Sequence, residues 1–393
     1  MSLPDAAPAP GGPLAEPVAG CAEFREPAYA DRSLGDVLPA VARALGVDAG
    51  LPRISDDGLV LPGASSYVVF LVDGLGYELL RDHPEEAPFL HAHLGEPATV
   101  GVPSTTATSL TSFGTALPPG AHGVVGFSSR IPGTDQLLNA LMWSKDVDPR
   151  EWQPHTTAFS RLAAAGVRTT VVNKRSFEGS GLTVAGHRGA DFVGVDRVGE
   201  RIAAVQAVSA TSPSVTYMYD GDLDWTGHRY GVDSPEWEQQ LVMIDAAAEH
   251  LRETLPDQTR ILVVADHGMV DSPMDNRLDV AEEPELAEGV VLLGGEARFR
   301  HVYCRSGAVD DVVATWSERI GDLAVVLTRD EAIGRGWFGP VAPAVRPRLG
   351  DVVVACRGDF AVVSTELFPY EARLVGLHGS LTPAEMLIPV LVL

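Results

Sequence analysis

Seven polar side chains in this sequence adjoin buried-strand patterns, although they lie far apart along the chain. They are Asp73, Thr106, Asp224, His228, Asp266, His267 and His378. An apolar run that ends in an acidic or imidazole side chain puts that group at the carboxyl end of a strand, where open α/β sheets build their sites. Three aspartates and three histidines gathered there can hold two divalent cations, between which a hydroxyl can act as a nucleophile. These residues predict a metal-dependent enzyme that cleaves phosphate esters.

The first group of candidate ligands directly follows two apolar runs. Asp73 ends YVVFLVD and precedes Gly-Leu-Gly, a turn that would expose its carboxylate above the sheet. As a structural residue, Asp73 could instead cap the following helix, because Asp is a favoured N-cap. Asp266 and His267 repeat the arrangement after ILVVA. Two adjacent ligand types at a strand end are less easily explained by capping, so this pair favours metal binding.

The second group of candidate ligands is Asp224, His228 and His378. Asp224 and His228 lie four residues apart after the strand-like run SVTYMY, so one helical turn can direct both at one point. The alternative is a polar turn with a solvated histidine. His378 lies in GLHGS just before the last apolar run, and a lone histidine there would usually be structural. The prediction therefore depends on the whole set rather than on any one member.

The candidate nucleophile is Thr106, in VPSTTATSLTSFG. Pro103 and Ser104 end an extended approach, and the small residues that follow begin a helix. A hydroxyl there lies near the positive end of the helix, where backbone N–H groups favour an anion. Threonine becomes a nucleophile only when a cation or a base activates it. These hydroxyls could also be ordinary helix caps, and Thr105 is chemically equivalent, so the pattern alone leaves the choice open.

The elements that must position these residues alternate between strand-like and helix-like patterns. The predicted strands are 66–72, 167–172, 214–219, 260–265 and 387–393, and the clearest helices are 157–165, 196–208 and 234–254. Near-continuous apolar strands that alternate with helices indicate a parallel sheet covered on both faces. The sequence therefore predicts an α/β fold.

The chain is expected to divide into three parts. Residues 1–33, rich in Pro, Ala and Gly, predict a loosely ordered N-terminal arm, and Ser33 then caps a short helix. Residues 34–270 and 351–393 form the catalytic domain. Residues 271–350 open with an acidic, loop-like stretch, after which short strands flank a helix. This region predicts a small inserted α+β lobe, which either roofs the site and sets its substrate preference or is a passive insertion.

The composition argues against several classes of protein. The 393 residues include 53 acidic and 29 basic ones, for a net charge of −24, which disfavours a nucleic-acid groove and docking on anionic lipid. Three scattered cysteines, Cys21, Cys304 and Cys356, form no disulfide framework and suit a reducing compartment. The N-terminus lacks a secretory-signal pattern, and no apolar run is long enough for a membrane span. We therefore expect a cytoplasmic protein.

Six motifs in order give the chain a resemblance to a known family. They are LVDGLG, PSTTATSLTS, LPPGAHGVVGF, LDWTGHRYG, VVADHGM and GLHGSLTPAEMLIPVL. Together they resemble the alkaline phosphatase superfamily, and within it the nucleotide pyrophosphatase/phosphodiesterase family of type I phosphodiesterases. The resemblance implies an alkaline-phosphatase-like three-layer sandwich with a mostly parallel central sheet.

The resemblance also implies a role for each candidate residue. The six acidic and imidazole side chains correspond to the ligands of two metal ions: Asp73, Asp266 and His267 for one, and Asp224, His228 and His378 for the other. Thr106, three residues after Pro103, corresponds to the nucleophile, which in the family forms a covalent phospho-enzyme intermediate. Zinc is the usual metal in this branch and suits the N/O ligand set, while manganese also occurs in the superfamily.

Two departures from the family pattern bear on the substrate. Animal-type members place an asparagine where this chain has Phe127, and nucleotide-cleaving members have an aromatic residue where it has Ala107. The aromatic residue five positions before Asp224 is kept as Tyr219. Tyr219 and Phe127 are therefore candidate substrate-binding residues. We expect hydrolysis of phosphodiester or pyrophosphate bonds in a small-molecule substrate, with a nucleotide leaving group in doubt.

Two alternative functions remain open. The first is a phosphomonoesterase or a phosphonoacetate-type phosphonate hydrolase, because phosphonoacetate hydrolases share the threonine and the ligand set. The second is a non-catalytic metal-binding protein, which retention of all six ligands together with the threonine makes the weaker interpretation. The sequence leaves the oligomeric state open.

Overall fold

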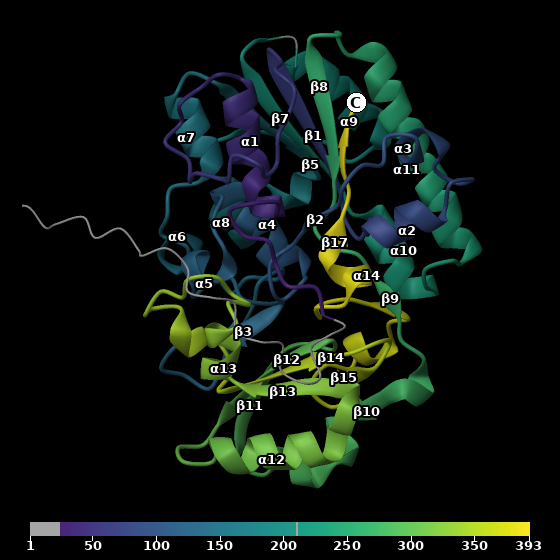
Figure 1. Cartoon of the computed structure of the whole chain (residues 1–393). Helices are drawn as coiled ribbons and strands as arrows, with labels where there is room; N and C mark the ends of the chain where they lie inside the picture. Colours follow the sequence, from purple (N-terminus) through teal and green to yellow (C-terminus); the bar gives the residue numbers. More distant parts are fainter. Residues whose placement is uncertain (1–23, 210) are drawn as a thin grey trace, which may run out of the picture.

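A six-stranded sheet forms the centre of the protein. The computed structural model describes residues 24–209 and 211–393 (Figure 1). The strand order is β18 (Val390–Val392), β8 (Thr259–Val264), β1 (Ser66–Val72), β7 (Ser214–Asp220), β5 (Arg168–Asn173) and β6 (Asp191–Gly194). All strands run parallel except β18, which is antiparallel to β8. The predicted α/β fold with a mostly parallel sheet is confirmed.

Helices cover both faces of this sheet (Figure 1). One layer contains α1 (Val37–Ala44), α4 (Thr106–Thr115), α7 (Ala158–Ala164) and α8 (Gly181–His187). The other contains α2 (Tyr77–Asp82), α3 (Pro88–His91), α9 (Val198–Val208), α10 (Asp222–Tyr230) and α11 (Pro235–Thr254). The arrangement is the three-layer sandwich that the family resemblance implied.

The central strands end at the same level, which decides where the site can form. All seven residues of β1 are buried, as expected for a strand covered on both faces. In the pairing register Val72 lies opposite Asp220 of β7, and Leu71 lies opposite Val264 of β8. The segments that leave β1, β7 and β8 therefore start side by side at one edge of the sheet.

A smaller antiparallel sheet lies below the large one in Figure 1, with α12 (Val309–Ile320) on its outer side. Its order is β11 (Val290–Glu296), β12 (Phe299–Cys304), β14 (Val352–Cys356) and β13 (Ala324–Thr328). Trp316 and Ile320 of α12 pack into a separate apolar cluster with Val302 of this sheet. The division at residues 271–350 stays a prediction, and the sheet itself continues past residue 350 into β14.

Short strand pairs connect distant segments of the chain. They are β16 (Gly376–Leu377) with β9 (Val270–Asp271), β17 (Leu387–Ile388) with β2 (Ala98–Thr99), β3 (Ser128–Arg130) with β4 (Leu137–Asn139), and β10 (Arg277–Asp279) with β15 (Ala361–Val363). The remaining helices are α5 (Pro119–His122), α6 (Pro149–Trp152), α13 (Arg329–Gly334) and α14 (Pro383–Met386). The pairing of β16 with β9 brings the segment before His378 beside the segment that follows His267.

Much of the expected N-terminal arm, residues 1–23, lies outside the described residues. From residue 24 onward the chain is attached to the body: the Arg25 N–H donates to the Leu381 carbonyl at 2.7 Å, and the Tyr29 hydroxyl donates to the Trp337 carbonyl at 2.8 Å. Ser33 precedes a 3-10 turn, Leu34–Asp36, and its N–H and hydroxyl both donate to the Asp36 carboxylate. The turn leads directly into α1.

Two further observations concern the sequence-based expectations. Cys304 and Cys356 are free thiols. Within the part of the chain that the structure describes, no helix combines the length and the apolar character needed to cross a membrane. The cytoplasmic location stays a prediction.

Candidate metal centre

Asp73, Asp266 and His267 form the first group of ligand atoms. Asp73 follows β1 and the other two follow β8, so the common strand ends bring them together. His267 Nε2 lies 3.3 Å from Asp73 Oδ1 and 3.7 Å from Asp266 Oδ2. All three residues are buried, and each offers a ligand atom within 4.8 Å of the other two.

Asp224, His228 and His378 form the second group. Asp224 and His228 lie one turn apart on α10, and His228 Nε2 is 3.4 Å from Asp224 Oδ2. His378 enters from the loop after β16, with its Nε2 3.8 Å from Asp224 Oδ1. These ligand atoms also lie within 4.8 Å of one another. The helical i, i+4 spacing thus directs two side chains at one point, as the sequence predicted.

The two groups adjoin each other. The rings of His267 and His378 stack with their centroids 3.6 Å apart and their planes at 16°. Gly74 allows the close approach of the α10 segment, because a Cβ there would lie 3.1 Å from the Asp224 Cα, and its φ of +76° also favours glycine. Thr106 Oγ1 lies 3.1 Å from His267 Nε2. The structure therefore brings all six predicted ligands and the predicted nucleophile together.

Thr105 and Thr106 are distinguished by their surroundings. Thr105 is the N-cap residue of α4, is buried, and faces the carboxylate of Glu296. Thr106 is the first residue of α4, only partly buried, and faces His267. Of the two hydroxyls, that of Thr106 therefore lies against the ligand groups at the positive end of the helix.

Each histidine of the centre is oriented by a backbone carbonyl. His228 Nδ1 donates to Gly376 O at 2.7 Å, His267 Nδ1 to Gly268 O at 2.9 Å, and His378 Nδ1 to Ser104 O at 2.9 Å. Since a carbonyl oxygen only accepts, each Nδ1 carries a proton, which leaves Nε2 directed at the centre. This second contact is the usual way in which proteins orient a metal-binding imidazole.

The charge state of the buried groups fits a metal centre. Each of the three ligand carboxylates has one oxygen without a hydrogen-bond partner among the described residues: Asp73 Oδ1, Asp224 Oδ1 and Asp266 Oδ2. Burial, followed by the nearby carboxylates Asp266 and Asp224, raises the pKa of Asp73 well above its ordinary value, and burial raises the pKa of those two groups as well. Unpaired buried carboxylates require a compensating positive charge.

The imidazoles fit the same charge balance. Burial lowers the pKa of His267, and burial together with His267 and His228 lowers the pKa of His378 well below its ordinary value. These two rings are therefore neutral at physiological pH, which is the form that binds metal. A set of three carboxylates and three imidazoles suits two divalent cations, and zinc is compatible with these N and O donors.

Sequence comparison places the chain in a family. A profile of the family described as type I phosphodiesterase / nucleotide pyrophosphatase matches residues 67–381. The chain belongs to this family. Its hydrolase class and its place in the alkaline phosphatase superfamily, both expected from the motifs, are thereby confirmed. Human ectonucleotide pyrophosphatase/phosphodiesterase family member 7 is 39% identical over 57 residues, which span only 13% of this chain and 12% of that protein.

Solved structures of similar fold support the architecture. Murine ectonucleotide pyrophosphatase/phosphodiesterase 5 matches with a TM-score of 0.65 at 15% identity, covering 83% of this chain and 87% of that one. Phosphonoacetate hydrolase from Sinorhizobium meliloti matches with a TM-score of 0.62 at 19% identity, covering 86% of this chain and 92% of that one. At these identities the similarity concerns the fold.

The two predicted substrate-binding residues, Tyr219 and Phe127, differ in their contacts: only Tyr219 bonds to one of the six ligands. The Tyr219 hydroxyl donates to Asp73 Oδ2, so this residue supports a ligand, while its ring packs edge-on against Phe177 with centroids 6.3 Å apart. The Phe127 N–H donates to Glu296 Oε2 at 3.0 Å. Ala107 is 1% exposed and packs in an apolar cluster. The substrate-binding roles of Tyr219 and Phe127 stay predictions.

Glu296 is the residue near the centre that sequence reasoning missed. It ends β11 in the small sheet, within GGEARF. The two glycines and two charged residues of this segment are typical of an exposed turn. Its carboxyl group is nevertheless buried, and burial raises its pKa to about 8. No local pattern could have indicated this position, because only the packing of the two sheets brings β11 beside the α4 segment.

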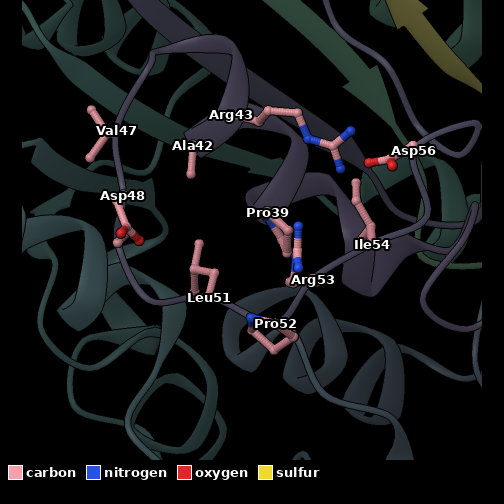
Figure 2. Close-up of a pocket in the computed structure, with 11 residues that line it drawn as sticks. Pro39, Ala42, Arg43, Val47, Asp48, Leu51, Pro52, Arg53, Ile54 and Asp56 are labelled. Atoms are coloured by element: carbon pink, nitrogen blue, oxygen red, sulfur yellow. The ribbon is translucent and has the colours of Figure 1, made fainter.

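A surface pocket of about 360 Å³ lies elsewhere, beside α1 (Figure 2). Apolar side chains such as Leu51 and Ile54 line it, together with Arg43 and Arg53. None of the six ligands contributes to this pocket, nor does Thr106. It is therefore distinct from the metal centre.

Proposed function

We propose that this protein hydrolyses phosphodiester or pyrophosphate bonds of a small-molecule substrate through a phospho-threonine intermediate. The observation that carries the proposal is the position of Thr106 Oγ1, 3.1 Å from His267 Nε2 and beside both ligand groups. Membership of the type I phosphodiesterase / nucleotide pyrophosphatase family supports the reaction class. A hydroxyl at the start of a helix, next to six metal-ligating side chains, suits attack on an anionic phosphorus centre.

The six ligands would hold two divalent cations, for which we propose zinc. When bound, these cations supply positive charge that stabilises the phosphate and lowers the pKa of the attacking hydroxyl. Asp73, Asp266 and His267 would hold one, and Asp224, His228 and His378 would hold the other. Manganese, which also occurs in the superfamily, is the alternative to be tested by metal analysis.

The reaction then proceeds through Thr106 in two steps. The Thr106 oxygen attacks phosphorus in line, the bond to the leaving oxygen breaks, and the threonine proton leaves with the released alcohol. The backbone N–H groups at the start of α4 favour the negative phosphoryl oxygens at this position. A water molecule next attacks the phospho-threonine, which restores the Thr106 hydroxyl and releases a phosphate monoester.

An exposed aromatic side chain near the centre suits an apolar or aromatic group on the substrate. Phe177 is 36% exposed and packs against Tyr219, whose hydroxyl bonds to the ligand Asp73. One similar structure is an inactive variant of murine ectonucleotide pyrophosphatase/phosphodiesterase 5 in complex with AMP. Nucleotides therefore belong among the substrates to be tested.

A phosphomonoesterase or phosphonate hydrolase is the second candidate. The observation that favours it is the small, buried Ala107 directly after the nucleophile, a position at which alanine offers no aromatic face to a base. A small anionic substrate needs no such face. The similar fold of a phosphonoacetate hydrolase is compatible with this alternative.

A substrate panel separates these functions. Zinc-loaded protein would be incubated with bis-p-nitrophenyl phosphate, p-nitrophenyl phosphate, phosphonoacetate and a nucleoside triphosphate, each with and without EDTA. We expect EDTA-sensitive cleavage, with kcat/KM for the diester at least about tenfold above the monoester, which corresponds to about 1.4 kcal/mol. Preference for the monoester or for phosphonoacetate would favour the second candidate. Metal-replete protein that cleaves none of them would point to a non-catalytic metal-binding protein.

A further inference from the structure

Glu296 connects the small sheet to two segments that form the metal centre. It lies at the end of β11, beside β3 of the main body (Figure 1), and is 6% exposed. Its Oε2 accepts the Phe127 N–H at 3.0 Å, and its carboxylate faces the Thr105 side chain. A Cβ on Gly379 would lie 2.6 Å from Glu296 Cγ. One side chain thus touches three segments from different parts of the chain.

Two of these segments carry residues of the proposed reaction. Thr105 directly precedes Thr106, and Gly379 directly follows His378. The segments are already joined to each other, because the Ser104 N–H donates to Gly379 O at 3.0 Å and His378 Nδ1 donates to Ser104 O. The Glu296 side chain packs, from the side of the small sheet, against the place where these two segments are hydrogen-bonded.

Gly379 shows how closely the Glu296 side chain fits. Its φ is +131°, in the region that favours glycine, and the Cγ, Cδ and Oε1 atoms of Glu296 occupy the space where a side chain would project. The backbone after His378 therefore lies directly on the glutamate. A shorter side chain at position 296 would remove both this contact and the acceptor of the Phe127 N–H.

We propose that Glu296 is a positioning residue that holds Thr106 and His378 in their relative arrangement through Thr105, Phe127 and Gly379. The inference rests on the proposed phosphoryl-transfer function. It also assigns a role to the small sheet, which contributes a side chain to the support of the site and is more than a passive insertion. Errors in position of about 1 Å are enough to cost an enzyme about 10²-fold in rate.

Three variants test this role. Glu296→Ala removes the acceptor and the packing, whereas Glu296→Gln keeps the shape and an acceptor oxygen. Asp245→Ala is the matched control, because Asp245 of α11 is also a carboxylate only 6% exposed that accepts backbone N–H groups, those of Phe89 and Leu90. All three would be compared with the wild type for kcat, KM, zinc affinity and Tm.

The expected pattern separates positioning from general destabilisation. Glu296→Ala should lower kcat for bis-p-nitrophenyl phosphate by about 10²-fold with little change in KM, and should weaken zinc binding by about tenfold. Glu296→Gln should restore both values, and Asp245→Ala should lower Tm while leaving both near the wild type. Wild-type kcat and zinc affinity in Glu296→Ala would overturn the proposal, as would losses in Glu296→Gln equal to those in Glu296→Ala.

The zinc measurement distinguishes failure of this inference from failure of the proposed function. It needs no substrate, because affinity is obtained by competition with a chelator. If the wild type cleaves no phosphoester, the proposed function fails, and zinc affinity alone then decides the role of Glu296. Weaker binding in Glu296→Ala with rescue in Glu296→Gln supports it, and equal affinities in all variants overturn it.

Discussion

Thr105 and Thr106 are identical in chemistry and differ in what their hydroxyls face. Thr106 Oγ1 contacts His267 Nε2, whereas Thr105 faces Glu296. We expect Thr106→Ala to lower kcat at least about 10³-fold, since the substitution removes the hydroxyl that lies against His267. Zinc content should remain at the wild-type level, because the six ligands are intact. Steady-state kinetics and elemental analysis of the purified variant check both statements.

A phosphoryl adduct provides the direct control for this assignment. Wild-type protein quenched during turnover should carry phosphate on the peptide that contains Thr106, as seen by mass spectrometry, and the Thr106→Ala variant should not. Thr106→Ser, which keeps a hydroxyl, should retain part of the activity. Full activity in Thr106→Ala would reject the threonine as nucleophile.

The two ligand groups should lose metal independently. Asp224→Ala removes the carboxylate shared by His228 and His378, whereas Asp266→Ala alters the group of Asp73 and His267. We expect each variant to retain about one equivalent of zinc where the wild type holds about two, because each group has its own three ligands. Elemental analysis after dialysis measures the equivalents. Loss of both metals from both variants would show one interdependent centre instead of two groups.

Those residues of the centre that directly follow a strand could be predicted from the sequence. Asp73 and Asp266 stand at the ends of apolar runs, and such positions meet at one edge of a parallel sheet. The residue types alone left Thr105 and Thr106 equivalent; the family resemblance pointed to Thr106, and the first turn of α4 directs its hydroxyl at His267. Glu296 could not be predicted, because it lies in the small sheet and its contacts are with segments that are far away in the sequence. Tyr219 was expected to face the substrate, and its bond to Asp73 depends on the neighbouring strands β1 and β7.

At the scale of elements, the site depends on a close crossing of two segments after β1 and β8. A Cβ on Gly268 would lie 1.9 Å from the Ala384 carbonyl oxygen and 2.9 Å from the Gly76 Cα. We expect Gly268→Ala to destabilise the protein by about 1–3 kcal/mol, because backbone atoms must shift to admit the methyl group. Zinc affinity should fall as well, since His267 is the adjacent residue. Thermal unfolding and zinc titration measure the two effects.

Gly199 provides the matched control for this substitution. It lies in the first turn of α9, and no atom lies within 4 Å of a Cβ built there. Gly199→Ala should leave zinc affinity unchanged and keep or raise Tm, because alanine is the better helix former by up to about 1 kcal/mol. A Gly268→Ala variant as stable as Gly199→Ala would contradict the packing argument.

The sequence indicates which elements exist better than it indicates which sheet they join. The run at 387–393 was predicted as one strand, but Pro389 interrupts it, and β17 and β18 pair with different partners. The run VVVAC is as apolar as β1, yet it forms β14 in the small sheet. Apolar periodicity reports burial, and burial does not specify a partner strand or its direction.

At the scale of the whole molecule, an already acidic protein gathers additional negative charge in its metal centre. The chain carries a net charge of −24. Three of its carboxylates lie together in the metal centre, and one oxygen of each accepts no hydrogen bond from the described residues. Such an arrangement opposes folding when the groups are ionised. The folded state should therefore depend on bound cations, or on protons, to neutralise this region.

Metal removal is accordingly expected to destabilise the protein more as pH rises from 7 to 8.5. Burial raises the pKa of Asp73 well above its ordinary value and that of Glu296 to about 8. A carboxyl group with a raised folded-state pKa contributes stability below its unfolded pKa and loses that contribution as pH rises toward the folded value. The lowered pKa values of His267 and His378 act in the opposite sense, but only as pH falls below about 6.5, so they do not affect this window.

The Tm of EDTA-treated protein should therefore fall between pH 7 and 8.5, while zinc-loaded protein changes less, because bound cations stabilise the ionised carboxylates. For each such group, the free energy of unfolding falls by at most about 1.4 kcal/mol per pH unit, or a few degrees of Tm in a chain of this size. Glu296→Gln removes one of the titrating groups, so its metal-free form should show a smaller fall. Thermal unfolding at both pH values, with zinc or with EDTA, supplies the four Tm values needed for each protein. A zinc-induced rise in Tm that stays constant or shrinks toward pH 8.5 would show that the buried carboxylates are not what the cations stabilise.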